Sequence, residues 1–186
     1  MPEVEHVEIV NAPISFVWDF VKDMGNWVQY LKGYQKHEVK NEKDSVWWIK
    51  GDVGIMARTV SFAVHIDEWL PEDRATFSMK GISEVMDGGG ALIMGPNVPG
   101  EETAAGKKGG LFKKKKKESA AAQPAPQAVA GADPNTTKLT FRLRINAGGL
   151  IGPMVNAVLG PVLKPIAEDF STKLKARIEE LYRTGK

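Results

Sequence analysis

The sequence predicts an α+β fold in which a curved antiparallel sheet wraps around one long C-terminal helix. Two observations lead to this prediction. Apolar residues recur at helical spacing through the last third of the chain, and alternating, strand-like segments joined by short turns fill most of what precedes it. Strands joined by short turns form an antiparallel sheet, and a sheet with one apolar face needs a cover. The C-terminal helix is long enough to provide that cover.

The elements before this helix can be placed in order. A first strand is expected at 5–10, and Pro13 follows it. Two short helices come next: residues 14–24 gather apolar side chains on one face, and a second helix follows Gly25, with Asn26 as its expected cap. The two-residue alternation typical of strands then appears at 35–40, 45–50, 58–69, 75–81, 85–94 and 138–146.

The long helix is expected over 150–182. Its apolar residues recur every three or four positions, and its opposite face is charged from Lys164 onward. Two prolines, Pro161 and Pro165, lie inside the pattern, and each removes an intrahelical hydrogen bond at a cost of about 3 kcal/mol. We therefore expect a kink or a restart near Gly160.

Size and composition suit a single domain covering residues 1–186. The chain is 42% hydrophobic and 26% charged, which is ordinary for a globular protein. It has no cysteine, which excludes disulfides and thiolate metal sites. No apolar run reaches the roughly 18 residues of a membrane span, and the acidic N-terminus has no signal-peptide pattern. We expect a cytoplasmic protein.

Residues 95–136 interrupt the strand pattern. Pro, Gly, Ala, Ser, Gln and Lys dominate this segment, and its few apolar residues cannot offset the entropy cost of ordering it. It is therefore expected to be a disordered insertion between the last two strands. The segment holds seven lysines against four acidic residues, a surplus of +3. Because the net charge of the whole chain is +2, the rest of the chain is nearly neutral, at −1.

Most of these lysines form one run, which allows three interpretations. A solvated linker is the simplest. Attraction to an anionic membrane is the second, because each lysine near such a surface contributes about 1 kcal/mol and adjacent apolar side chains can insert. The third is an acidic partner protein or nucleic acid, of which nucleic acid is disfavoured because the run lacks interleaved aromatics and arginines. The residues concerned are Leu111, Phe112, Lys113, Lys114, Lys115, Lys116 and Lys117.

No catalytic, metal or cofactor motif is recognisable. The three histidines, His6, His37 and His65, lie on separate expected strands, whereas a metal site or a nucleophile–base pair needs convergent groups. The three consecutive glycines at 88–90 lack the strand-to-helix context of a phosphate-binding loop, so a β-bulge or turn is the better interpretation. Three carboxylates are candidates for proton transfer, but nothing in the sequence distinguishes them from ordinary solvated carboxylates; they are Asp52, Asp67 and Glu68. We assign no catalytic residue, no metal and no cofactor.

Several segments resemble the START-like, SRPBCC superfamily of helix-grip proteins. The opening signature is similar in Asn11-Ala12-Pro13, Val17-Trp18, Asp23, Trp27 and Leu31-Lys32-Gly33. Residues 160–179 are similar to the superfamily's final helix, including its tolerated internal proline. Residues 51–58 resemble a strand junction of the carbon monoxide dehydrogenase G-subunit family and of polyketide cyclase/dehydrase-like members. Lys32 stands where many relatives have proline, and residues 95–136 have no counterpart in the general pattern.

The resemblance implies a hydrophobic cavity between the long helix and the concave sheet, open near the short helices. Members bind lipids, isoprenoids, polyketides or other apolar small molecules. The side chains expected to point into this cavity are Trp18, Trp27, Tyr30, Phe62, Val64, Phe77, Met79, Phe141, Leu143, Met154, Val155, Val158 and Leu159. A filled core built from the same residues is the alternative, although a curved sheet and one straight helix leave a gap that side chains fill only in part.

Three functions are compatible with this sequence. The preferred prediction is a non-enzymatic carrier of a hydrophobic small molecule, such as a lipid, quinone or isoprenoid. Its basic loop would dock on the inner face of a membrane or on an oxidoreductase subunit, since the carbon monoxide dehydrogenase G-subunit family is associated with both. The second is an aromatase/cyclase- or dehydratase-type enzyme acting on a polyketide-like substrate, which a buried polar residue of perturbed pKa would favour. The third is a protein–protein adaptor with a filled core.

Overall fold

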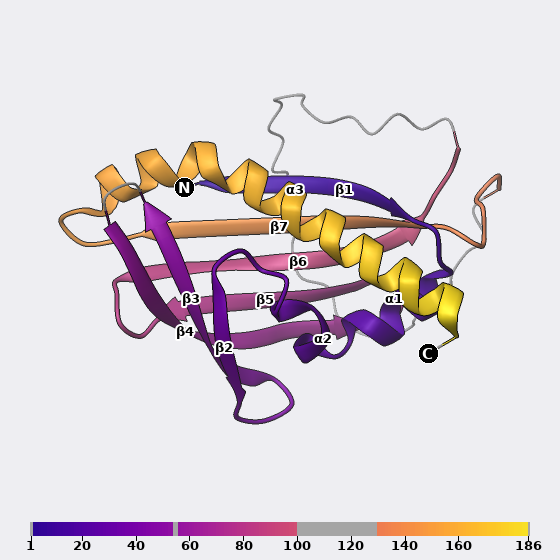
Figure 1. Ribbon diagram of the computed structural model, residues 1–186, viewed down its shortest axis with the longest axis horizontal. Coiled ribbons are helices and arrows are strands. Elements are labelled where there is room, and N and C mark those ends of the chain that lie inside the picture. Colours follow the sequence, from indigo (N-terminus) through magenta and orange to yellow (C-terminus); the bar gives the residue numbers. More distant parts are fainter. Residues whose placement is uncertain (1, 54–55, 100–129, 186) are drawn as a thin grey trace, which may run out of the picture.

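A seven-stranded antiparallel sheet wraps around one long helix in the computed structural model, which describes residues 2–53, 56–99 and 130–185 (Figure 1). The elements are β1 (Glu3–Val10), α1 (Ile14–Val21), α2 (Met24–Val28), β2 (Tyr34–Val39), β3 (Asp44–Val53), β4 (Met56–Leu70), β5 (Arg74–Gly81), β6 (Met86–Pro96), β7 (Thr137–Ala147) and α3 (Gly152–Thr184). The predicted α+β architecture is confirmed, with two short helices after the first strand and the long helix at the end.

The sheet has the order β1-β7-β6-β5-β4-β3-β2, and all neighbouring strands are antiparallel. The first and last strands therefore lie side by side, and the others follow one another along the chain. The strand register shifts between Tyr34 and Lys36 and again between Ile66 and Glu68. Such irregularities bend a strand, and here they accompany the curl of the sheet toward α3. Figure 1 shows α3 running obliquely across the sheet, and it contacts β1, β7 and β3.

The glycine triplet of β6 does not form the predicted bulge or turn. Gly88, Gly89 and Gly90 keep a continuous register with both neighbouring strands. Their lack of a side chain allows close approach instead: a Cβ on Gly90 would lie 2.6 Å from Cζ of Phe77, and one on Gly88 would lie 2.4 Å from the carbonyl oxygen of Arg144. The glycines therefore make room for a core aromatic ring over a flat stretch of strand.

Helix α3 is one uninterrupted helix, so the predicted restart near Gly160 is wrong. Proline leaves the carbonyl four residues before it without its helical donor, and for Pro161 and Pro165 those carbonyls belong to Ala157 and Pro161. Ala157 and both prolines lie on the exposed face, where water can hydrate these oxygens. The helix can therefore continue through both positions.

The start of α3 is tied to the end of β7 through one side chain. The amide of Asn156 accepts from the backbone N–H of Ala147 at 2.8 Å, and its nitrogen donates to the carbonyl oxygen of Ala147 at 3.0 Å. At the other end, Glu179 accepts from the backbone and the side chain of Asn11 at 2.8 and 2.9 Å. These contacts fix the two ends of α3 relative to the sheet and α1.

Helix α2 begins one turn earlier than expected. Its N-cap is Asp23, whose carboxylate accepts from the backbone N–H of Gly25 at 2.9 Å, so the assignment of Asn26 as the cap is wrong. Carboxylates are good caps because they accept from the unpaired N–H groups of the first turn. The side chain of Asn26 donates instead to the carbonyl oxygen of Phe20 at 3.1 Å, which joins the two short helices.

The predicted insertion begins two residues too early. Residues 95 and 96 belong to β6, where Pro96 pairs with Thr137 of β7. Beyond them, the side-chain amide of Asn97 donates to Oγ1 of Thr136 at 3.1 Å. The backbone carbonyl oxygen of Asn97 accepts from the N–H of Asp133. The position between the last two strands is as predicted. Residues 100–129, with the run from Leu111 to Lys117, lie outside the described residues.

Phe170 links α3 to the sheet and to α2. It is fully buried, and its ring centroid lies 4.4 Å from that of Phe141 and 6.3 Å from that of Trp27. Large-to-small changes at such positions lose the burial of the ring and leave a cavity, which together cost about 3–5 kcal/mol.

We predict that Phe170→Ala lowers the free energy of unfolding by about 3–5 kcal/mol in urea titrations followed by circular dichroism. The matched control is Thr172→Ala, two residues further along α3 and exposed, which should change it by less than about 0.5 kcal/mol. A loss at Phe170 no larger than that at Thr172 would contradict this packing.

Candidate functional site

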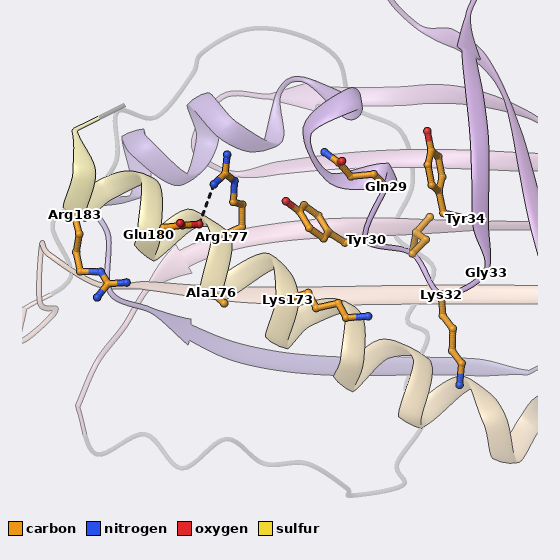
Figure 2. A pocket seen from close by; sticks show the side chains of 11 residues that line it. Gln29, Tyr30, Lys32, Gly33, Tyr34, Lys173, Ala176, Arg177, Glu180 and Arg183 are labelled. Atoms are coloured by element: carbon orange, nitrogen blue, oxygen red, sulfur yellow. Dashed lines mark hydrogen bonds and ion pairs between the residues drawn. The ribbon is translucent and has the colours of Figure 1, made fainter.

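A groove of about 850 Å³ lies between α3 and the segment that leads from α2 into β2 (Figure 2). One wall is a turn held by Gly33, which has a φ of +84° and whose carbonyl oxygen accepts from the N–H of Lys50 at 2.7 Å. A side chain at this position would collide with the carbonyl of Lys50, so glycine fits the turn best. The lining residues are Gln29, Tyr30, Leu31, Lys32, Gly33, Tyr34, Lys173, Ala176, Arg177, Glu180 and Arg183.

The groove is rich in positive charge. Lys32, Lys173, Arg177 and Arg183 line it against the single carboxylate of Glu180. Arg177 donates to Glu180 at 2.9 Å, as Figure 2 shows, and Lys173 pairs with a carboxylate outside the lining. The lining therefore carries a surplus of positive charge, although each exposed charge alone contributes little.

The floor of the groove is the surface of the hydrophobic core. Leu31 is buried in that core and Tyr30 packs against it, while both also line the groove. Trp27 precedes these two residues in the chain and is buried. The centroid of its ring lies 5.7 Å from that of Trp47 and 5.6 Å from that of Phe77. These rings, with Phe170 of α3, form an aromatic layer between α3 and the sheet.

Two buried polar atoms have no hydrogen-bond partner among the described residues. They are Nε1 of Trp47, on β3, and Oγ of Ser171, on α3. Both residues are buried, at 0% and 2% exposure. Leaving such groups unpaired in an apolar interior costs about 1–3 kcal/mol each, which is why they are rare. No feature of the sequence marks them, because satisfaction of a buried group depends on what the fold places beside it.

Most of the predicted cavity residues do turn toward the interior. Buried are Trp27, Phe62, Val64, Phe77, Met79, Phe141, Leu143 and Leu159, and partly buried are Trp18, Tyr30 and Val155. Several touch one another in the aromatic layer. Ligand contact by any of them stays a prediction.

Met154 and Val158 do not point inward, and that part of the prediction is wrong. They are 62% and 42% exposed. Apolar residues surround this first part of α3, so helical spacing alone could not select the buried side. Burial of Gly152 and Leu159, together with the attachment of Asn156 to β7, turns Met154 and Val158 to solvent.

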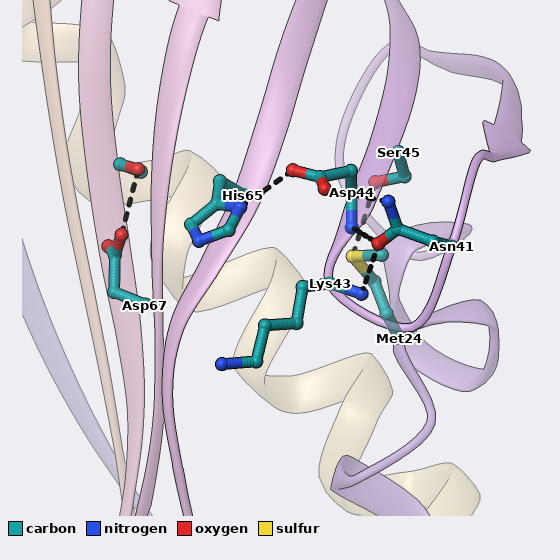
Figure 3. A network of polar contacts seen from close by, with 8 residues as sticks. Met24, Asn41, Lys43, Asp44, Ser45, His65 and Asp67 are labelled. Carbon is teal, nitrogen blue, oxygen red and sulfur yellow. Dashed lines mark hydrogen bonds and ion pairs between the residues drawn. The ribbon is translucent and has the colours of Figure 1, made fainter.

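The histidines and the carboxylates among the described residues form separate pairs at or near the surface. Nδ1 of His65 lies 2.6 Å from Oδ1 of Asp44, beside the Asn41 turn (Figure 3). Hydrogen bonds from His65 and then from Asn41 lower the pKa of Asp44 below its ordinary value. Asp67 accepts instead from the hydroxyl of Ser78 at 3.0 Å.

The remaining titratable candidates are equally dispersed. His6 pairs with Glu8 at 3.1 Å, His37 contacts the Tyr34 hydroxyl at 2.8 Å, and Glu68 pairs with Arg74. Within residues 2–53, 56–99 and 130–185 no three His, Cys, Asp or Glu side chains come close enough to hold a metal ion. The side chain of Asp52 lies outside the described part.

The fold and its interior define a helix-grip protein of the START-like, SRPBCC type. The sequence profile of the family described as polyketide cyclase / dehydrase and lipid transport matches residues 10–171, and the chain belongs to this family. A comparison with curated proteins gave no significant match.

Solved structures with the same fold share little sequence with this chain. A conserved protein from Geobacillus kaustophilus is 13% identical, with 97% of each chain covered and a TM-score of 0.64. A START superfamily protein from Mycobacterium smegmatis is 13% identical, covering 96% of this chain and 98% of that one, with a TM-score of 0.60. The Zhui aromatase/cyclase from Streptomyces sp. R1128 is 14% identical, covering 96% and 94%, with a TM-score of 0.57.

Proposed function

We propose that this protein binds and carries a hydrophobic small molecule between α3 and the sheet. The observation that carries the proposal is the groove between α3 and residues 29–34, whose floor is the apolar core and whose rim is cationic. Ligand sites of this kind combine an apolar lining with a few polar groups that orient the ligand. A lipid, quinone or isoprenoid-like molecule would place its apolar part inside and a polar end at the rim.

An aromatase/cyclase or dehydratase activity is the second candidate, and an adaptor with a filled core is the third. Proton transfer on a polyketide-like substrate needs a titratable group in the interior. Among the described residues, the buried polar ones are Ser45, Thr137 and Ser171, and the carboxylates of lowered pKa, Glu38 and Asp44, lie at the surface. This distribution favours a carrier over an enzyme.

Mass spectrometry of an organic extract, beside a native mass spectrum, tests the carrier function. We predict a stoichiometric lipid, quinone or isoprenoid, either co-purified or taken up when offered in excess. A clean ligand-free spectrum after loading would contradict the proposal and favour the adaptor.

A pair of variants tests the route of entry. Ala176→Trp fills the groove from α3, whereas Thr172→Trp places the same ring on an exposed position outside the lining. Uptake should slow in the first and stay at the wild-type rate in the second.

We also propose that one end of the molecule touches a lipid bilayer. Among the described residues, six of the nine exposed large hydrophobic side chains gather there: Ile82, Val85, Leu150, Ile151, Met154 and Val158. We call this set the aliphatic end. The Gly148 N–H donates to the carbonyl oxygen of Val85 at 2.7 Å, so the β5–β6 turn and the loop before α3 lie side by side.

Three properties of the aliphatic end favour lipid over protein as its partner. Four of its six residues lie between Arg144 and Lys164, a stretch without a charged residue, and Glu84, between the other two, is paired with Arg58. The set holds no Trp, Tyr or Arg, the residue types that dominate protein–protein hot spots. Leu150 is 103% exposed, so it protrudes as freely as in an extended peptide and can insert between acyl chains.

This contact would complement the basic run at Lys113–Lys117. We propose that the run attracts the same membrane, or an oxidoreductase subunit, as the resemblance to the carbon monoxide dehydrogenase G-subunit family implies. No helix among the described residues is both long enough and apolar enough to cross a bilayer. We propose that the contact is peripheral and at the inner face of the membrane.

Co-sedimentation with phosphatidylcholine vesicles, with and without phosphatidylglycerol, tests both contacts. We predict that the double variant Leu150→Ser/Met154→Ser loses binding to both kinds of vesicle, because inserted apolar area supplies that affinity. Replacing Lys113–Lys117 with glutamine should remove only the extra binding to phosphatidylglycerol.

The control is Leu70→Ser on β4, a residue of 39% exposure that pairs with Arg74 at the start of β5, whereas Ile82 follows the other end of that strand. This variant should bind like the wild type. Equal binding by Leu150→Ser/Met154→Ser and wild-type protein would rule out insertion of the aliphatic end.

A further inference from the structure

Met154 combines an exposed position with an oxidisable sulfur atom. The residue is 62% exposed, whereas Met24, Met79 and Met94 are buried in the core at 6%, 5% and 3% exposure. Met86 is partly buried and packs against the same core. The chain has no cysteine, so no thiol of its own competes for an oxidant. Among the methionines of the described residues, Met154 is therefore the one that an oxidant in solution reaches most easily.

The surroundings of Met154 in the first turn of α3 are apolar. Residues three and four positions away lie beside a helical side chain, and here they are Leu150, Ile151, Ala157 and Val158. The nearest polar side chain in the sequence is that of Asn156, whose amide is bonded to the backbone of Ala147 at 2.8 and 3.0 Å. An oxygen atom added to the Met154 sulfur therefore meets no free side-chain donor in this turn and relies on water for its hydrogen bonds.

We propose that Met154 is a site of reversible oxidation that weakens the contact of the aliphatic end with a bilayer. This inference rests on the proposed membrane contact and adds its regulation. The oxidant is a peroxide. In the reaction with hydrogen peroxide the O–O bond breaks, one oxygen atom forms an S=O bond with the thioether sulfur, and water leaves. The sulfur is oxidised by two electrons, and the peroxide is reduced.

The two forms of the side chain differ in their affinity for acyl chains. Reduced methionine is flexible and apolar, so it inserts with its aliphatic neighbours. In the sulfoxide, insertion would strip water from the S=O oxygen without supplying a donor, which is unfavourable. Leu150 and the other members of the aliphatic end stay apolar, so we expect binding that is weaker by about tenfold and not abolished.

The modification can be reversed. Methionine sulfoxide reductases remove the oxygen atom as water while a dithiol is oxidised to a disulfide, and the two epimers of the sulfoxide need different enzymes, MsrA and MsrB. Exposure of Met154 leaves its sulfoxide open to these enzymes, whereas a sulfoxide in the core would first require unfolding.

Co-sedimentation of the full-length protein with phosphatidylcholine vesicles, before and after dilute hydrogen peroxide, tests this inference. Peptide mass spectrometry locates the added oxygen atoms. Met154 should gain oxygen before Met24, Met79 and Met94, vesicle affinity should fall about tenfold, and treatment with MsrA and MsrB should restore it.

Two variants separate Met154 from other oxidisable residues. The measured quantity is the ratio of vesicle affinities after and before peroxide, so a change in basal affinity does not matter. Met154→Leu lacks the sulfur and should keep a ratio near one. Met86→Leu removes the thioether of a partly buried methionine outside the aliphatic end, and its ratio should fall as in the wild type.

Three results would overturn the inference while leaving the membrane contact intact. They are equal affinity of the oxidised and reduced wild type, an equal loss in Met154→Leu, and a loss that appears only when core methionines are oxidised and the thermal midpoint falls. The last result would mean that release follows from damage to the core. Failure of the untreated protein to bind vesicles would overturn the membrane contact itself.

Discussion

The contact of Phe170 with Trp27 and Phe141 is the interaction on which the rest of this structure depends. It joins α3 to α2 and to β7, and through Trp47 and Phe77 it reaches β3 and β5. A single helix can cover a curved sheet only if large side chains fill the distance between them, and these rings do so. The groove lies between α3 and the turn at Gly33, and Leu31 belongs both to its lining and to the hydrophobic core.

The site separates two kinds of polarity. Charged side chains lie at the groove, where water solvates them and each contributes little to stability. The interior instead holds two uncharged donors in surroundings that exclude water, where a hydrogen bond is stronger and its absence costs more. Unpaired groups of this kind lower the stability of a folded protein.

Most of the fold could be predicted from the sequence, because two-residue alternation marks the strands and a long apolar stripe marks α3. The errors have physical causes. Gly90 looked like a turn because its role is visible only when the ring of Phe77 lies over it. Met154 and Val158 looked buried because the first turns of α3 are apolar on all sides. The burial of residues such as Phe77 and Phe141 could be predicted from the alternation of their strands. The lack of hydrogen-bond partners for Trp47 and Ser171 could not, because it depends on long-range packing that no local pattern encodes.

The most direct test of the account is a nitrogen-15 NMR titration of the indole N–H signals of the five tryptophans with 2-methyl-3-geranyl-1,4-naphthoquinone, an apolar quinone probe. The Trp27 signal is identified by its loss in Trp27→Phe. The account predicts that this signal shifts on binding, because the ring of Trp27 lies in the aromatic layer between α3 and the sheet. A Trp27 signal that stays in place at saturation would contradict the central claim that the ligand binds between α3 and the sheet.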